Sequence, residues 1–220
     1  MNHNTISTSR AAIGAAALAL IVVGCASTGP SRSAKTVDTM DDTHKELSKV
    51  RQQIDQTLVS LDGVMRASPA ELQTSFKRYS KDVDELKSDA RKTARRFEDM
   101  KSMKAKYLAA WEKERSQVED PELRRIGEQR RSAAKVNLER VVDSLNVANE
   151  AFDPFLKNLT DVQTILGNDL TATGQGLVGG SSVVQNANTH GARVAENIDV
   201  ARAALSEVAG QISSTGAMIN

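Results

Sequence analysis

Aromatic residues, proline and cysteine are all scarce in this chain of 220 residues. Aromatic residues make up 3% of the sequence and hydrophobic residues of all kinds 40%, so a core must consist mostly of Leu, Val, Ile and Ala. That composition suits thin helical layers better than a thick globular centre. There are four prolines and no alternating run of β-branched residues, so nothing predicts a β-strand. The single cysteine excludes an intrachain disulfide bond.

Groups of residues that carry catalysis or bind metals are missing too. The three histidines have no cysteine or paired carboxylate at metal-ligand spacing, and no nucleophile elbow occurs. We interpret His44 as a partly exposed histidine on a helix seam, not as a ligand or base. The sequence therefore predicts no enzyme: no catalytic residue, no metal, no cofactor and no small-molecule substrate.

One short motif invites a nucleotide-binding interpretation. Gly174-x-Gly176-x-x-Gly179, with Asp199 twenty residues beyond, matches the dinucleotide fingerprint. The fingerprint needs a preceding hydrophobic strand in a βαβ unit, and the residues before Gly174 are mostly polar. Glycines at a bend, or at a close approach of two helices, explain the motif better. We expect residues 167–180 to form a loop.

The charge is nearly balanced, at +1 overall, but it is unevenly placed. Residues 71–140 carry 19 Lys/Arg and 14 Asp/Glu, whereas residues 141–220 carry 3 and 8. Opposite net charges favour packing of the two segments side by side, and the weak basic excess disfavours binding of nucleic acid. The basic face of residues 77–140 has two interpretations. It is a solvated helix surface with weak ion pairs, such as Arg78 with Asp82, or a docking strip for anionic lipid or a cell-wall polymer.

The amino terminus has the pattern of a secretory signal. A polar start with one positive charge precedes the apolar run 11–23, which is too short to span a bilayer comfortably. The run is followed by Gly24 and Cys25, which resemble the lipobox of bacterial lipoproteins. The resemblance implies that residues 1–24 are a signal peptide, that Cys25 is lipidated (palmitate among its acyl groups), and that Ala26 directs the protein to the outer membrane. An incidental cysteine and an uncleaved anchor are the alternatives. Residues 25–36 are rich in small residues and predict a flexible tether.

The stretch from Leu72 to Val118 predicts a long helix. Steps of four and three alternate along it, the 3.5-residue seam of a helix packed against other helices. The fourteen seam positions are Leu72, Phe76, Tyr79, Val83, Leu86, Ala90, Thr93, Phe97, Met100, Lys104, Tyr107, Trp111, Glu114 and Val118. Eleven of them are apolar, all except Thr93, Lys104 and Glu114. Lys104 and Glu114 interrupt the seam and are candidates for fixing its register.

Similar seams predict three further helices. We expect helices over about 37–67, 69–118, 121–166 and 177–219, with Ser68-Pro69-Ala70-Glu71 and Asp120-Pro121 as helix starts. In the first helix the seam combines the apolar row Met40, Leu47, Ile54 and Leu61 with the mixed row Val37, His44, Arg51, Leu58 and Met65. In the third, Pro154 predicts a kink or a short break after Asp153. The fold class is all-α: residues 37–220 form one elongated, antiparallel, coiled-coil-like bundle of about four long helices.

Several short segments together resemble an uncharacterised family of bacterial lipoproteins, domain of unknown function 2959. The similarity spans about residues 36–219 and is carried by four segments: Trp111-Glu112-Lys113-Glu114, Leu123-Arg124-Arg125, Phe152-Asp153-Pro154-Phe155-Leu156 and Asn168-Asp169-Leu170-Thr171. The Gly-rich stretch after Thr173 departs from the pattern. The resemblance implies a lipoprotein and no assigned activity, so it supplies no catalytic residue.

These observations favour a lipid-anchored protein of the bacterial envelope that faces the periplasm. Its rod-like body would act as a spacer, scaffold or partner-binding module. One partner would be the membrane, through the lipid on Cys25. The other would be another envelope protein or a second copy of this chain, bound through the helical seams. The alternative is a helical protein that remodels membranes, with residues 177–184 as the segment that enters the bilayer.

Overall fold

The computed structural model describes residues 29–217, and all five of its elements are α-helices. They are α1 (Gly29–Arg66), α2 (Leu72–Arg115), α3 (Pro121–Asn168), α4 (Ala172–Gly179) and α5 (Ser182–Ala217). The all-α prediction is confirmed, with five helices instead of about four. The prediction of an unstructured loop over 167–180 is wrong, because α4 occupies most of it.

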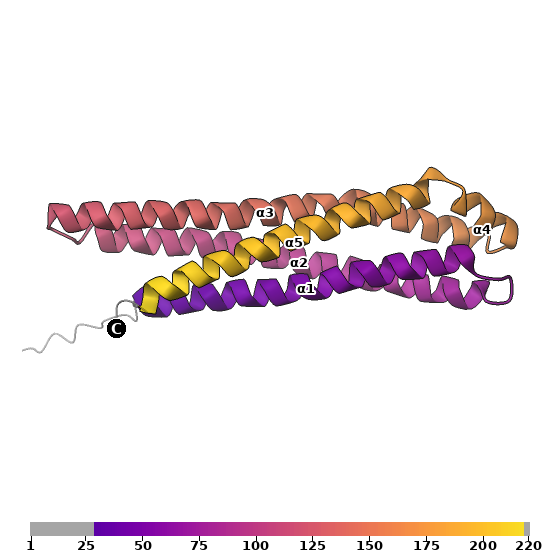
Figure 1. The fold of residues 1–220 in the computed structure, drawn as a ribbon, viewed down its shortest axis with the longest axis horizontal. Helices are drawn as coiled ribbons and strands as arrows, with labels where there is room; N and C mark the ends of the chain where they lie inside the picture. The colour runs from indigo at the N-terminus through magenta and orange to yellow at the C-terminus, as the bar shows by residue number, and fades with distance from the viewer. Residues whose placement is uncertain (1–28, 218–220) are drawn as a thin grey trace, which may run out of the picture.

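The four long helices form an antiparallel bundle (Figure 1). Helix α1 packs against α2 and α5, and α3 packs against the same two helices, so each long helix has two neighbours. At 1.5 Å per residue, the 48 residues of α3 make a rod about 70 Å long. The short helix α4 closes one end of the rod. The start of α1, the α2–α3 connection and the end of α5 lie at the other end.

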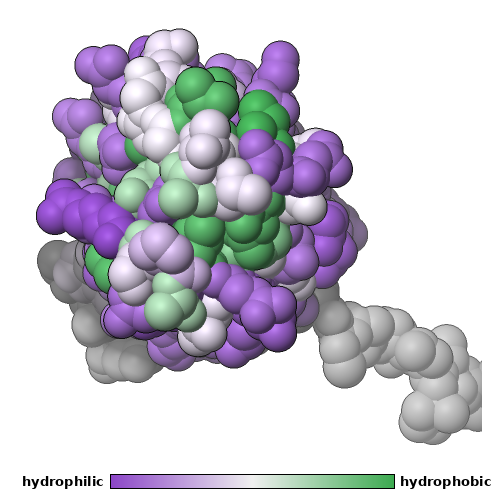
Figure 2. Space-filling view, turned by 90° about the vertical axis from the view of Figure 1, so that its right-hand side faces the viewer, coloured by the Kyte–Doolittle hydropathy of each residue, from purple (hydrophilic) through white to green (hydrophobic). Residues whose placement is uncertain are grey.

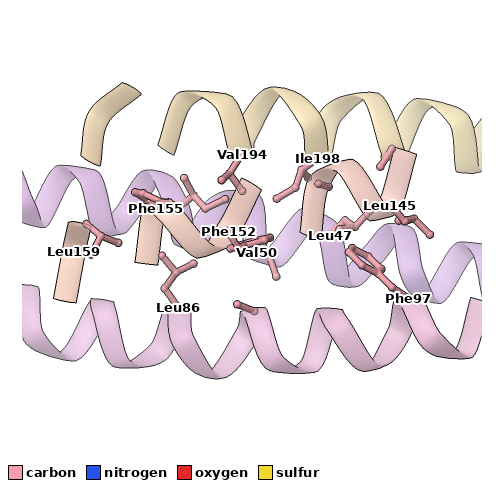
Figure 3. Close-up of a cluster of buried hydrophobic side chains, with 14 of the residues drawn as sticks. Leu47, Val50, Leu86, Phe97, Leu145, Phe152, Phe155, Leu159, Val194 and Ile198 are labelled. Atoms are coloured by element: carbon pink, nitrogen blue, oxygen red, sulfur yellow. The ribbon is translucent and has the colours of Figure 1, made fainter. Parts of the chain in front are cut away.

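The core is a continuous apolar column to which all four long helices contribute. Figure 3 shows its middle part, where Leu47 and Val50 of α1 face Leu86 and Phe97 of α2, with side chains from α3 and α5 beside them. The seam predicted for 72–118 is confirmed over most of its length: nine of its fourteen positions are buried, namely Leu72, Tyr79, Val83, Leu86, Ala90, Thr93, Phe97, Met100 and Tyr107. The sparse aromatic content is therefore concentrated where it fills the centre of the bundle.

The first helix corrects the prediction in two ways. Residues 29–36 are helical instead of a tether, and Pro30 lies in the first turn, where its missing N–H leaves no hydrogen bond unmade. The second buried row of α1 consists of Thr36, Thr43, Val50, Thr57 and Val64, not the predicted row from Val37 to Met65. Threonine can be buried here because its hydroxyl bonds its own helix: Thr43 Oγ1 donates to the Thr39 carbonyl at 2.8 Å.

The helix starts are partly as predicted. Asp120 caps α3, its Oδ1 accepting from Leu123 N at 2.8 Å, and Pro121 takes the first helical position. Helix α2 begins at Leu72, three residues later than expected, although the Glu71 carboxylate still accepts from Ser68 Oγ at 2.7 Å. No break follows Asp153, since α3 runs through Pro154. Proline has no N–H to donate to the backbone carbonyl four residues earlier in the helix. Pro154 is exposed, so water can donate to that carbonyl instead.

Candidate functional site

The predicted lipidation site, Cys25, lies outside the described residues. The structure does show where the chain that follows it enters the fold. Helix α1 begins at Gly29, four residues after Cys25, at the end of the rod shared with the α2–α3 connection and the end of α5. We call this end of the rod the entry end.

A clamp between α1 and α2 fixes the start of α1. Both terminal nitrogens of Arg32 donate to the Glu114 carboxylate, each at 2.7 Å. The Arg32 guanidinium also lies 5.8 Å from the centre of the Tyr107 ring, and Tyr107 stacks on Trp111 at 5.9 Å between ring centroids. Bidentate pairing and a cation–π contact both favour arginine over lysine at this position.

The burial of the two partners in the clamp is unequal. The Arg32 side chain is 10% exposed, whereas Glu114 is 53% exposed. The hydrogen bond from Arg32 keeps the pKa of the Glu114 carboxyl below its usual value. Glu114 interrupts the apolar seam predicted from sequence, and in the structure its carboxylate pairs with Arg32 of α1. Arg32 itself fell in the predicted tether and was missed.

A second ionic cluster joins α2 and α3 near their connection. Arg115 pairs with Glu112 at 2.5 Å and with Glu128 at 3.3 Å, while Arg131 pairs with Glu112 at 3.3 Å and with Glu128 at 3.7 Å. Hydrogen bonding to Arg115 lowers the pKa of Glu112, and the same bond raises that of Arg115. Because every member pairs with two others, the cluster joins α2 and α3 close to their connection.

Beside the clamp lies an open groove with a volume of about 690 Å³. Its walls are mostly apolar and come from all four long helices; they include Tyr107, Trp111, Leu123, Ile126, Val208 and Ile212. Gly29 and Pro30 line it as well, so the first residues of α1 form part of its wall. The groove exists because the α2–α3 hairpin extends past the start of α1 and the end of α5 (Figure 1).

The groove also corrects the predicted seam of α3. That seam was expected to be buried from Leu123 onward, but Leu123 is 60% exposed and Ile126 40% exposed. Burial of α3 begins at Leu138. The apolar pattern of α3 starts at its first turns, but α1 and α5 do not extend far enough to cover these residues.

The Gly-rich segment forms a structural cap at the opposite end of the rod. Thr171 caps α4 by accepting from Gly174 N at 3.1 Å, and Gln175 Nε2 donates to the carbonyls of Val64 and Ala67 at 2.8 and 2.9 Å. A Cβ on Gly174 would lie 2.3 Å from the Asp169 carbonyl oxygen, which explains that glycine. The fingerprint glycines Gly174, Gly176 and Gly179 thus all lie within α4, and no strand precedes them in the described chain.

The apolar surface at the α4 end is the third feature of note. Leu177 of α4 is 72% exposed. Figure 2 looks onto this end of the rod and shows apolar residues gathered near its middle, surrounded by hydrophilic ones. The two ends of the rod therefore differ: one has an apolar groove with a clamp, the other a small apolar surface on a cap.

The remaining sequence candidates have ordinary environments. His44 is partly exposed, as predicted. The basic face of 77–140 carries local ion pairs of both signs, including Lys81–Glu85 at 3.4 Å and Lys101–Glu98 at 2.7 Å. The expected Arg78–Asp82 pair is wrong: Asp82 is 5% exposed and accepts from Gln56 Nε2 of α1 at 3.4 Å. Neither Asp82 nor Gln175 was predicted to be buried, because no periodic pattern marks a polar residue that turns inward.

The described residues contain neither a metal-binding cluster nor a membrane-spanning helix. No group of three or more His, Cys, Asp or Glu side chains within 29–217 is placed to hold a metal ion. None of the helices in that range combines the length and apolarity needed to cross a bilayer.

Comparison with known proteins gives one match. A family model with the description "Protein of unknown function (DUF2959)" matches residues 25–211, as the resemblance predicts. No curated protein and no solved structure matches the chain.

Proposed function

We propose that this chain, which belongs to the family described as "Protein of unknown function (DUF2959)", is a lipid-anchored bacterial envelope protein whose rod acts as a spacer, scaffold or partner-binding module, without catalysis. Lipid on Cys25 would hold the entry end at the outer membrane, facing the periplasm. The observation that carries the proposal is the short distance along the chain between Cys25 and a helical rod that begins at Gly29.

Three features support this proposal. The lipobox-like Gly24-Cys25 follows a signal-like apolar run, and the family match starts at Cys25, where removal of a signal peptide would leave the new amino terminus. Residues 29–36 are helical, so only three residues separate Cys25 from the helical body. The clamp between Arg32 and Glu114 fixes the first turn of α1 to α2, so that a force at the lipid would be passed to the bundle.

Cell fractionation tests the anchor. The full chain is expressed in a bacterium with a lipoprotein-processing pathway, and wild type is compared with Cys25→Ser and with Ser27→Ala as a matched control. Wild type and S27A are expected in the outer-membrane fraction, and C25S in the soluble fraction or uncleaved. A C25S protein that is processed and remains in the outer membrane like wild type would contradict the proposal.

Photo-crosslinking tests the scaffold role. A photoreactive amino acid is placed at one of three exposed positions distributed along the rod: Val59, Val200 or Leu177. A scaffold predicts that one envelope protein, or a second copy of this chain, is captured reproducibly from at least one of these positions. Turnover of a small molecule by the purified protein would overturn the non-catalytic part of the proposal.

Membrane remodelling is a second candidate, and the exposure of Leu177 at the α4 end favours it. In this case the α4 end would touch a bilayer, and residues 177–184 would enter it. Leakage of dye from liposomes distinguishes the two functions. Remodelling predicts leakage that Leu177→Glu reduces, whereas a scaffold predicts no leakage from either protein.

A further inference from the structure

The apolar groove at the entry end lacks an occupant among the described residues, although its walls are mostly apolar, as the core of the bundle is. Leu123 and Ile126 of α3 are 60% and 40% exposed there, and Trp111 is partly exposed beside them. Its volume of about 690 Å³ lies within the roughly 300–1,000 Å³ typical of pockets that bind a small apolar ligand. Most such pockets combine apolar walls with a few polar groups, and here Arg32 and Glu114 are among the polar lining residues.

We propose that the groove binds one acyl chain carried by Cys25 of the same molecule. This inference rests on the proposed lipidation of Cys25. Its occupant is chosen from where the described chain begins: Gly29 lines the groove, and it lies four positions after Cys25. Four residues span at most about 14 Å when fully extended, so the lipid cannot be far from the groove.

The clamp directs the chain to the groove. Arg32 is fixed on Glu114 and Tyr107, and Tyr107 stacks on Trp111, which lines the groove. The first turn of α1 is therefore held against the groove wall, and its first residues, Gly29 and Pro30, line the groove. Only three residues lie between Cys25 and Gly29, so an acyl chain attached at Cys25 can reach the groove at a small cost in loop-closure entropy.

Membrane anchoring remains compatible with this arrangement. By resemblance to bacterial lipoproteins, the mature Cys25 carries a diacylglycerol and an acylated amino group. Two chains in the leaflet are enough for stable anchoring, so the third is free to bind the protein. The bound chain would then fix the angle of the rod at the membrane, which a flexible tether alone cannot do.

Photo-crosslinking with a fatty acid tests the proposal in the full chain. Cells expressing the protein are fed a palmitate analogue with a photoreactive diazirine, the membranes are irradiated, and the purified protein is digested for mass spectrometry. Crosslinks are expected from the Cys25 peptide to the groove, in peptides containing residues 107–126 or 208–212 of the same chain. Crosslinks elsewhere on the rod, to phospholipid alone, or to a second copy of the chain would overturn the inference.

Two charge variants and a matched control sharpen the test. Leu123→Glu and Ile126→Glu place a carboxylate in the groove, and both positions are exposed enough to accept the change without unfolding. Val147→Glu, on the same helix at 53% exposure, does not line the groove. Both groove variants are expected to reduce the yield of groove crosslinks about tenfold or more, and V147E is expected to leave it unchanged. Unchanged yields in L123E and I126E would overturn the inference.

The mass of the Cys25 peptide separates this inference from the proposed function. An unlipidated Cys25 contradicts both. A lipidated Cys25 without groove crosslinks contradicts only the inference and leaves the anchored rod in place. Trp111 gives an independent signal, because it is the single tryptophan of the chain. Its emission is expected at shorter wavelength in the lipidated protein than in Cys25→Ser, and equal emission in the two would contradict occupancy of the groove.

Discussion

Arg32 and Glu114 lie 82 positions apart in sequence and form a bidentate ion pair, with both hydrogen bonds at 2.7 Å. The pair joins the first turn of α1 to the last turn of α2. It sets the position at which the chain leaves the proposed anchor and enters the bundle.

Removing either partner should loosen the start of α1 without unfolding the rod. Because Glu114 is half-exposed, we expect Arg32→Ala and Glu114→Ala each to lower the free energy of unfolding by no more than about 1 kcal/mol. Amide hydrogen exchange over residues 33–40 should accelerate in both variants. Lys45→Ala, which removes an exposed pair within α1, is the control and should leave that exchange unchanged. Unaltered exchange in R32A would contradict the role given to the clamp.

Tyr79 should make stability depend on alkaline pH. Its hydroxyl is buried and donates to the Leu159 carbonyl at 2.7 Å, and burial raises its pKa well above the ordinary value near 10. The folded state favours the neutral phenol, so this contribution is complete below about pH 10 and is lost as pH rises toward the folded pKa. Urea unfolding of wild type should therefore show a steeper fall in stability above pH 10 than that of Tyr79→Phe.

At neutral pH, Tyr79→Phe should lower the free energy of unfolding by about 1 kcal/mol through loss of the hydrogen bond. Tyr107→Phe is the comparison, since the Tyr107 hydroxyl has no hydrogen bond to any residue of the described range. A larger loss in Y107F than in Y79F would contradict this assignment.

Alanine substitutions at two glycines of α5 should change the stability of the protein in opposite directions. A Cβ on Gly191 would lie 2.9 Å from Phe155 Cε2 and 3.0 Å from Leu58 Cδ1, and Phe155 is fully buried. We expect Gly191→Ala to destabilise the protein by about 1–3 kcal/mol through overpacking. A Cβ on Gly210 meets nothing within 4 Å, so Gly210→Ala should stabilise by up to about 1 kcal/mol through helix propensity. Thermal unfolding of the two variants gives the comparison, and stabilisation by G191A would show that the helices are not closely packed there.

Gln175 should stabilise the α4 end by capping another helix. Its amide nitrogen donates to the carbonyls of Val64 and Ala67 at the end of α1. Gln175→Ala removes both bonds and should lower the free energy of unfolding by about 1–2 kcal/mol, with faster amide exchange around residues 61–72. Gln185→Ala, at an exposed position of α5, should be near neutral. An equal loss of stability in Q175A and Q185A would contradict the capping role of Gln175.

The long apolar seams made most of the bundle predictable from sequence. Seam positions such as Val83 and Leu86 repeat at the period that helix packing requires, and both are buried. The threonines of α1 were harder, because Thr43 and Thr57 look polar in sequence while their hydroxyls bond carbonyls of their own helix. A pattern of hydrophobicity assigns such residues to the wrong face.

The ends of the rod were less predictable than its middle. Helix α4 depends on the docking of Gln175 onto α1, 108 and 111 positions away in sequence, which local propensity does not contain. The groove depends on where α1 and α5 end relative to the α2–α3 hairpin. Heptads in α3 indicate that Leu123 and Ile126 can pack, but not whether a helix reaches them.

The most direct test of the account is the mass of the amino-terminal peptide of the full chain, extracted from bacterial membranes. We expect the mature protein to begin at Cys25 and this residue to carry a diacylglycerol and an amide-linked acyl chain. An amino terminus at another residue, or a Cys25 peptide of unmodified mass, would contradict it.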